Sequence, residues 1–187
     1  MPAITTNDLK NGITLDLGNG LFQVVEFQHV KPGKGGAFVR TKLRNVRTGA
    51  VLERTFNAGV RVEQAIVDRQ DMQFLYRDGD DYVFMNTATY DQIHVRPAQL
   101  GDAAEYLVEG AVAQIAQHGS EIIGVEIPAS VELSVAVTEP GLQGDRVSGA
   151  RKSAELETGK TVQVPLFVNV GDKVRVDTRS GEYITRV

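Results

Sequence analysis

The stretch LFQVVEFQHVKPGKGGAFVRTKLRNV, residues 21–46, decides the fold, because two alternating runs flank a glycine-rich segment. Side chains of a strand alternate between faces, so these runs predict the paired strands of a β-hairpin. Glycine permits the positive φ of a tight reversal, and proline fixes φ in the arm before it. Lys34 is therefore expected at the exposed tip. The residues expected to shape this loop are Pro32, Gly33, Gly35 and Gly36.

The second strand of the hairpin is expected to carry a cationic stripe. Period-two alternation places three basic side chains on one face and Val39 and Leu43 on the other, which would be the core side. Five basic residues and no acid occur between positions 31 and 44, a density suited to phosphate. A charged strand face by itself is more often simply a solvent-exposed surface. The adjoining lysine tip favours the alternative, that the face binds a phosphate ligand. The basic residues are Lys31, Lys34, Arg40, Lys42 and Arg44.

Charge is divided unevenly along the chain, whose net charge is −4 and pI about 5.4. Residues 1–64 carry nine basic and five acidic residues, a net of +4. Residues 65–127 carry three and eleven, a net of −8, whereas residues 128–187 carry eight of each. This division suggests an elongated molecule that offers a positive end to a polyanion. The alternative is that the acidic surface only maintains solubility.

Composition indicates an all-β protein. The 187 residues include nineteen glycines, six prolines and no tryptophan, which fits short strands joined by tight turns. The absence of cysteine excludes disulfides, thiolate zinc sites and thiol catalysis. No run approaches the roughly 20 apolar residues of a membrane span, and no signal peptide is recognisable. We therefore expect a cytoplasmic protein with no membrane partner.

Turn signals divide the chain into three small β-barrels with one short helix. The expected domains are residues 1–64, 65–127 and 128–187, and the last two fit OB-type barrels. A helix is expected to begin near Gly101, with Asp102 as its N-cap and Gly110 as its stop. The run AVAQIAQ, residues 111–117, is ambiguous and is interpreted as a strand. Within residues 130–137, the expected inward side chains are Val131, Leu133, Val135 and Val137.

No catalytic, metal or cofactor site is indicated. The three histidines, His29, His94 and His118, fall in different blocks without a second ligand at metal-site spacing. The glycines around the tip lysine lack the spacing and the Ser/Thr of a phosphate-binding P-loop. Asp80 and Asp81 are adjacent and would point to opposite faces of a strand. An enzyme is therefore not expected.

Four runs, taken together, are typical of one family. They are KPGKGGAFVR (31–40) followed by TKLRN and TGAVLERTF, FLYRDGDDYVFMN (74–86), VTEPGLQGDRVSG (137–149) and LETGKTVQVPLFVNVGDKVRVDTRSGEYITRV (156–187). Through these runs the chain resembles bacterial elongation factor P over essentially its full length, which implies a KOW/SH3-like barrel followed by two OB-folds in an L-shaped, tRNA-like arrangement. The archaeal and eukaryotic counterparts carry a similar lysine loop on a shorter chain.

The resemblance implies a monomeric translation factor that binds the 70S ribosome between the P and E sites. It would relieve stalling at consecutive prolines by positioning peptidyl-tRNA, since alignment assists a reaction without chemistry from the protein. Lys34 would reach toward the CCA end, and the other basic residues of the hairpin would meet tRNA and rRNA phosphates. Gly144 and Asp145 would approach the E-site codon. Tyr183 and Arg186 match positions near the small subunit and the tRNA, although Tyr183 as a core residue and Gly144 as a turn residue remain open.

In this family the tip residue is often extended after translation, as β-lysyl-lysine or an aminopentanol adduct on lysine, which implies a modifying enzyme acting on Lys34. Members with a bare lysine often have proline two residues later, where this chain has Gly36. One alternative is a general KOW/OB-type RNA-binding or rRNA-associated structural protein, which would show no dependence on proline codons. Another is an enzyme of RNA metabolism, which would need a catalytic cluster that the sequence does not contain.

Overall fold

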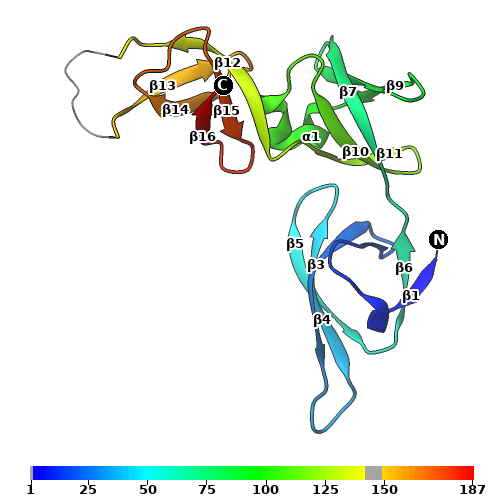
Figure 1. The fold of residues 1–187 in the computed structure, drawn as a ribbon. Helices are drawn as coiled ribbons and strands as arrows, with labels where there is room; N and C mark the ends of the chain where they lie inside the picture. Colours follow the sequence, from blue (N-terminus) through cyan, green and yellow to red (C-terminus); the bar gives the residue numbers. More distant parts are fainter. Residues whose placement is uncertain (1, 142–148) are drawn as a thin grey trace. The chain divides into compact units, whose positions relative to one another are not determined.

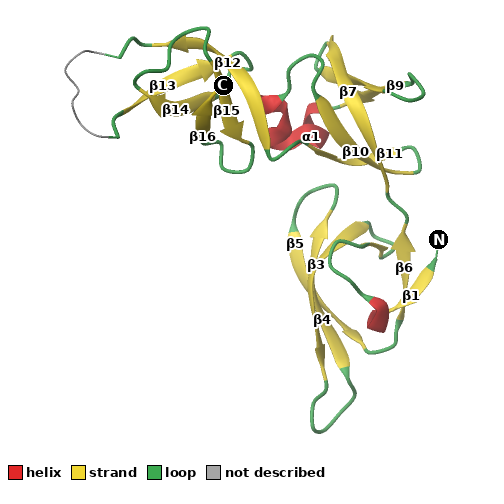
Figure 2. Ribbon diagram, viewed as in Figure 1, coloured by secondary structure: helices red, strands yellow, loops and turns green. Residues whose placement is uncertain are grey.

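The computed structural model describes residues 2–141 and 149–187 of the chain. It confirms the all-β prediction, because sixteen strands of these described residues form one six-stranded and two five-stranded sheets (Figures 1 and 2). The chain folds into two compact units. The first contains Met1–Arg69 and Ile115–Gly124, and the second contains Gln70–Gln114 and Val125–Val187. Each unit is described separately below.

The six-stranded sheet belongs to the first unit and is built around the predicted hairpin. Its core contains Leu15, Val24, Val39 and Leu43, which are almost completely buried. Thr6, in the 3₁₀ helix η1 (Thr6–Asp8), donates from its hydroxyl to the carbonyl of Asn57 at 3.0 Å. In spatial order the strands are β1 (Ala3–Thr5), β6 (Arg61–Ala65), β2 (Thr14–Asp16), β3 (Leu21–Val30), β4 (Phe38–Asn45) and β5 (Val51–Asn57), so β5 is an edge strand.

The second sheet contains β10 (Val112–His118). The ambiguous run at residues 111–117 is therefore a strand, as predicted. The large buried side chains of this region include Phe74, Phe84 and Ile115. In spatial order its strands are β11 (Glu121–Glu126), β10 (Val112–His118), β7 (Asp68–Asp78), β8 (Asp81–Asn86) and β9 (Gln92–Val95).

The predicted helix lies close to its expected position but has different ends. Helix α1 (Pro97–Leu100) starts before Asp102, because Pro97 is preset for the first helical turn. The backbone N–H of Arg96, its N-cap, donates to the side chain of Gln99 at 2.9 Å. A 3₁₀ helix, η2 (Gly101–Tyr106), follows and ends before Gly110. The predicted cap and stop were therefore wrong. No helix among the described residues is long and apolar enough to span a membrane.

The third sheet surrounds an apolar core that includes Leu133, Val135 and Val174. Val137 was expected to point inward, but it is 60% exposed. The reason is a register shift between Val135 and Val137 against β13, since a bulge reverses the alternation of the side chains that follow it. In spatial order the strands are β14 (Thr161–Pro165), β13 (Arg151–Leu156), β12 (Ser130–Thr138), β15 (Lys173–Asp177) and β16 (Tyr183–Arg186).

A segment outside the third sheet completes its core. Tyr106, the last residue of η2, is 4% exposed and packs in the same cluster as the sheet residues. The preceding residue, Glu105, accepts a hydrogen bond from Lys160 at 2.7 Å, and its carbonyl accepts one from Thr158 at 2.6 Å. The hydrogen bond to Glu105 raises the pKa of Lys160. Two segments of the second unit are thus joined by one buried ring and two polar contacts.

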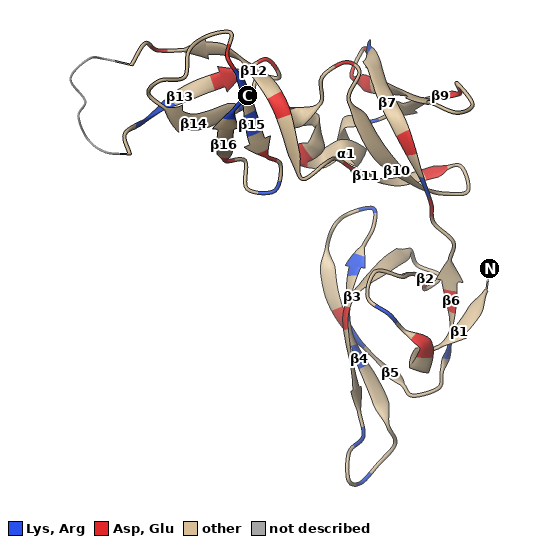
Figure 3. Ribbon diagram, in the orientation of Figure 1, with Lys and Arg blue, Asp and Glu red and all other residues tan. Residues whose placement is uncertain are grey.

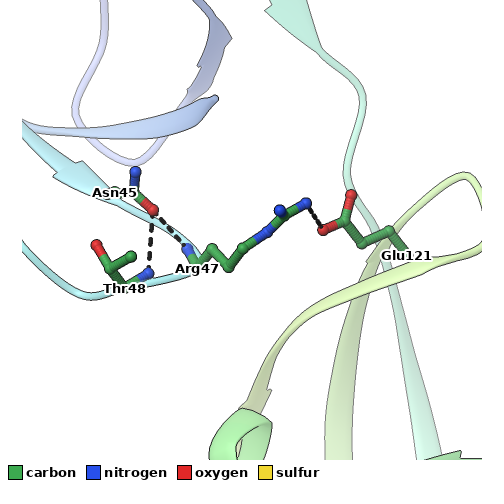
Figure 4. Close-up of polar contacts among 4 residues, drawn as sticks. All are labelled: Asn45, Arg47, Thr48 and Glu121. Carbon is green, nitrogen blue, oxygen red and sulfur yellow. Dashed lines mark hydrogen bonds and ion pairs between the residues drawn. The ribbon is translucent and has the colours of Figure 1, made fainter. Parts of the chain in front are cut away.

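Polar contacts within the first unit involve the turn after β4. The side chain of Asn45 accepts from the backbone N–H groups of Arg47 and Thr48 at 2.9 and 3.0 Å (Figure 4). This arrangement holds the turn in shape, and the Arg47 guanidinium pairs with the Glu121 carboxylate. Nearby, Nδ1 of His118 lies 2.8 Å from the carbonyl of Ile66.

Candidate nucleic-acid interface

The predicted hairpin is a long two-stranded arm. Strands β3 and β4 pair from Phe22 and Asn45 out to Val30 and Phe38, with one bulge between Val24 and Glu26. Beyond that last pair the chain forms a loop that projects past the other strands of the sheet (Figure 1). Lys34 lies in this loop and is exposed, as predicted, together with Lys31, Pro32, Gly33, Gly35 and Gly36.

The loop is held only by its two ends. No hydrogen bond or ion pair joins residues 31–36 to another described residue. Gly35 has φ +109°, a conformation that side-chain-bearing residues rarely adopt, whereas Gly33 and Gly36 have no positive φ. A Cβ at Gly33 or Gly36 would have no atom within 4 Å. The backbone conformation therefore requires glycine at position 35. At positions 33 and 36, a larger side chain would contact no other part of the described protein.

Strand β4 separates charge from core as predicted. Arg40 and Arg44 are exposed and Lys42 is half-buried, while Val39 and Leu43 on the other face are buried completely. Figure 3 marks the basic positions along the arm in blue. The neighbouring strands place acidic side chains beside this stripe, which the sequence analysis did not predict. The ammonium of Lys42 lies 3.6 Å from the carboxylate of Glu26 on β3. On the other side of β4, Glu53 of β5 is the residue directly opposite Lys42 in the strand pairing. These acids offset the charge in the middle of the stripe.

The arm carries planar groups on the face opposite the stripe. The ring of His29 meets that of Phe27 edge-on, with centroids 5.6 Å apart. On β5, the guanidinium of Arg54 lies 5.0 Å from the ring centroid of Phe56. Sequence reasoning considered His29 only to reject it as a metal ligand or catalyst, and it did not consider Arg54. The signal that would have found them is the register of the three strands, which places them on the face shared with Val39.

The remaining predicted residues lie elsewhere. Gly144 and Asp145 fall outside the described residues. Tyr183 and Arg186 are on β16 in the second unit, so the described contacts do not bring them together with Lys34. Tyr183 is partly buried against the core, which supports the alternative of a core role. Arg186 is half-exposed, lies 3.5 Å from the carboxylate of Asp172, and stacks over Phe167 at 5.0 Å.

The described residues offer little for metal binding or acid–base chemistry. They contain no group of three or more His, Cys, Asp or Glu residues that could hold a metal ion. His94 lies 3.9 Å from Asp78 and 4.0 Å from Asp81, and all three side chains are substantially exposed. The arrangement that stands out is the cationic arm with its free lysine tip, which suits an anionic polymer.

Comparison with known proteins identifies the family. Three family models match, described as the elongation factor P (EF-P) KOW-like domain over residues 5–62, the EF-P OB domain over 67–125, and the elongation factor P C-terminal domain over 131–186. Elongation factor P of Acidothermus cellulolyticus is 60% identical over 182 residues, covering 97% of each chain. The chain belongs to the elongation factor P family. Elongation factor P of Streptomyces coelicolor is 59% identical over 184 residues, covering 98% of each chain.

Solved structures support the fold of this elongation factor P family member. Translation initiation factor 5A from Methanococcus jannaschii matches with a TM-score of 0.55 and 24% identity, over 68% of this chain and 92% of its own. A translation initiation factor of the eIF-5A family from Naegleria fowleri matches with a TM-score of 0.53 and 14% identity, over 67% and 98%. The predicted KOW-like barrel followed by OB-type domains is thereby confirmed.

Proposed function

We propose that this member of the elongation factor P family is a translation elongation factor that binds the 70S ribosome between the P and E sites. There it positions peptidyl-tRNA and relieves stalling at consecutive prolines. The observation that carries this proposal is the exposed lysine tip on a paired two-stranded arm whose strand β4 presents arginines to solvent. The full-length likeness to proteins named elongation factor P supports it.

Lys34 is the residue that reaches toward the CCA end of the peptidyl-tRNA. An ammonium with no partner in the described chain is available to RNA, because phosphate and base oxygens are acceptors for its three donors. Lys31, Arg40, Lys42 and Arg44 contact RNA phosphates and fix the position of the arm. Arg40 and Arg44 contribute most, since the carboxylate of Glu26 already partners Lys42. Holding the substrate in a reactive alignment accelerates peptide bond formation without a catalytic group on the protein.

The remaining roles follow the same assignment. Gly144 and Asp145 approach the E-site codon, and Arg186 lies near the small subunit, with Tyr183 supporting its strand. An enzyme that extends lysine would find the tip accessible, because residues 31–36 are all exposed. The factor acts as a monomer in the cytoplasm, where the ribosomes are. Its three domains comprise residues 1–64, 65–127 and 128–187.

The test is the rate of Pro-Pro-Pro synthesis on purified ribosomes, with protein isolated from its native source so that any modification is retained. We expect a several-fold acceleration confined to proline runs. Lys34→Ala should abolish the acceleration and leave thermal stability unchanged, whereas Lys10→Ala, another exposed lysine of the first unit, should retain it. Unchanged acceleration by Lys34→Ala would refute the role of the tip. Ribosome binding without acceleration by the wild-type protein would favour a general RNA-binding protein.

A further inference from the structure

Two Asn-Gly pairs lie in exposed turns near the start of the chain. Asn11 and Gly12 precede β2, and Asn19 and Gly20 lie between β2 and β3. Both asparagine side chains are exposed. The backbone nitrogen of a following glycine can attack the asparagine side chain, because glycine has no side chain to hinder the approach. The two pairs are therefore alike in sequence, and the hydrogen bonds of the fold distinguish them.

The backbone nitrogen of Gly12 is held in a hydrogen bond. It donates to the carbonyl of Val24 at 2.7 Å. The carbonyl of Gly12 in turn accepts from the side-chain amide of Gln23 at 3.4 Å. Attack by the Gly12 nitrogen on the side chain of Asn11 would first break the bond to Val24, which occupies its proton and fixes its direction. The fold therefore protects Asn11.

The backbone nitrogen of Gly20 has no hydrogen-bond acceptor among the described residues. The turn is closed by other groups. The carbonyl of Gly20 accepts from the N–H of Leu17 at 3.2 Å, and the carboxylate of Asp16 accepts from the N–H of Gly18 at 2.9 Å. The side chain of Asn19 is exposed and makes no hydrogen bond with a described residue. A nucleophile next to its target and without a competing partner favours intramolecular ring closure.

We propose that Asn19 is a site of spontaneous deamidation, whereas Asn11 is protected from it. The backbone nitrogen of Gly20 loses its proton and attacks the side-chain carbonyl carbon of Asn19. A carbon–nitrogen bond forms, the side-chain nitrogen leaves as ammonia, and a succinimide ring remains. Water then opens the ring at either of its carbonyls, which leaves aspartate or isoaspartate at position 19. The proposal depends on the turn alone and not on the proposed function.

The product changes both charge and backbone at this turn. Asn19 lines a hollow of about 420 Å³ together with Arg47 and Glu121, whose side chains form an ion pair. Deamidation adds a carboxylate to the same hollow. Isoaspartate also inserts a methylene into the main chain between Leu17 and Gly20, whose hydrogen bond closes the turn. The turn between β2 and β3 is thus the place where the age of the protein alters its first unit.

The experiment incubates the folded full-length protein in mildly alkaline buffer made with water labelled with heavy oxygen. Ring opening places the label in the new carboxylate, so only deamidation during the incubation is counted. Tryptic digestion leaves Asn11 and Asn19 on one peptide, and tandem mass spectrometry locates the label within it. We expect position 19 to react at least about fivefold faster than position 11, the factor that corresponds to one hydrogen bond. In guanidinium chloride the bond to Val24 is absent, so the two positions should react at similar rates.

The matched variants are Asn19→Gln and Asn11→Gln, because glutamine keeps the amide but its longer side chain closes the ring poorly. Circular dichroism checks that both are folded. Asn19→Gln should remove most of the label from this peptide, and Asn11→Gln should leave it unchanged. The proposal is overturned if position 19 does not react faster than position 11 in the folded protein. It is also overturned if the ratio of the two rates is the same in denaturant, or if the folded Asn19→Gln variant keeps the label.

Discussion

Replacing Tyr106 with alanine tests whether η2 is part of the core of the third sheet. The ring is 4% exposed among Leu133, Val135, Val174 and their neighbours, and Lys160 Nζ lies 5.5 Å from its centroid. Truncating a buried aromatic side chain costs about 3–5 kcal/mol, since transfer energy is lost and a cavity is left. For a protein of this size, that corresponds to a fall in Tm of about 6–20 °C.

Differential scanning calorimetry of the full-length protein is the suitable assay. Tyr106→Phe should cost about 1 kcal/mol or less, because the ring stays in place and only the hydroxyl is removed. Tyr76→Ala makes the same chemical change as the test variant at a side chain that is 46% exposed, and it should change Tm little. If Tyr106→Ala melts within about 2 °C of Tyr76→Ala, η2 does not contribute to that core and the reasoning is wrong.

Three further changes have defined outcomes. Gly35→Ala forces a side chain onto a backbone with φ +109°, so the loop should change shape and proline-dependent acceleration should fall more than with Gly36→Ala, at equal Tm. Gly141→Ala places a Cβ 2.6 Å from the carbonyl oxygen of Leu166, which should destabilise the protein by about 1–3 kcal/mol, whereas Gly124→Ala, with no atom within 4 Å, should be neutral. Hydrogen bonds from the backbone N–H groups of Ser180 and Arg179 lower the pKa of Asp177 in the folded protein. The contribution of this carboxylate to stability is therefore fully present above the unfolded carboxyl pKa of 3.8, and it is lost as the pH falls through the lower pKa of the folded state. Asp177→Asn should therefore flatten the acid limb of a plot of Tm against pH, and an acid limb like that of the wild type would count against this cap.

Local patterns predicted the arm and the faces of its side chains well. Alternation in residues 37–46 separated Arg40 and Arg44 from Val39 and Leu43, and the structure has the same division. The turn glycines predicted an exposed Lys34 because a reversal needs a residue free of side-chain constraints, which Gly35 supplies. Such features depend on neighbours in sequence, so a single sequence contains them.

Features that depend on partners distant in sequence could not be predicted. The pairing of Lys42 with Glu26 arises from strand register and a bulge, neither of which is visible in either strand alone. The bulge that exposes Val137 belongs to the same class. Tyr106 lies well before residue 128, the proposed start of the last domain, yet it packs in that domain's core. A domain boundary predicted from turn residues takes no account of side chains on one side of the boundary that pack into the core on the other side.

The loop at the end of the arm lets evolution alter chemistry without altering the fold. Residues 31–36 form no hydrogen bonds with the rest of the described chain, and a Cβ at position 33 or 36 would meet no atom. A substitution there changes few native contacts, so it does not move the protein toward its stability threshold. Selection can therefore vary the tip independently of the barrel, whereas substitutions at Val39 or Leu43 remain constrained by packing.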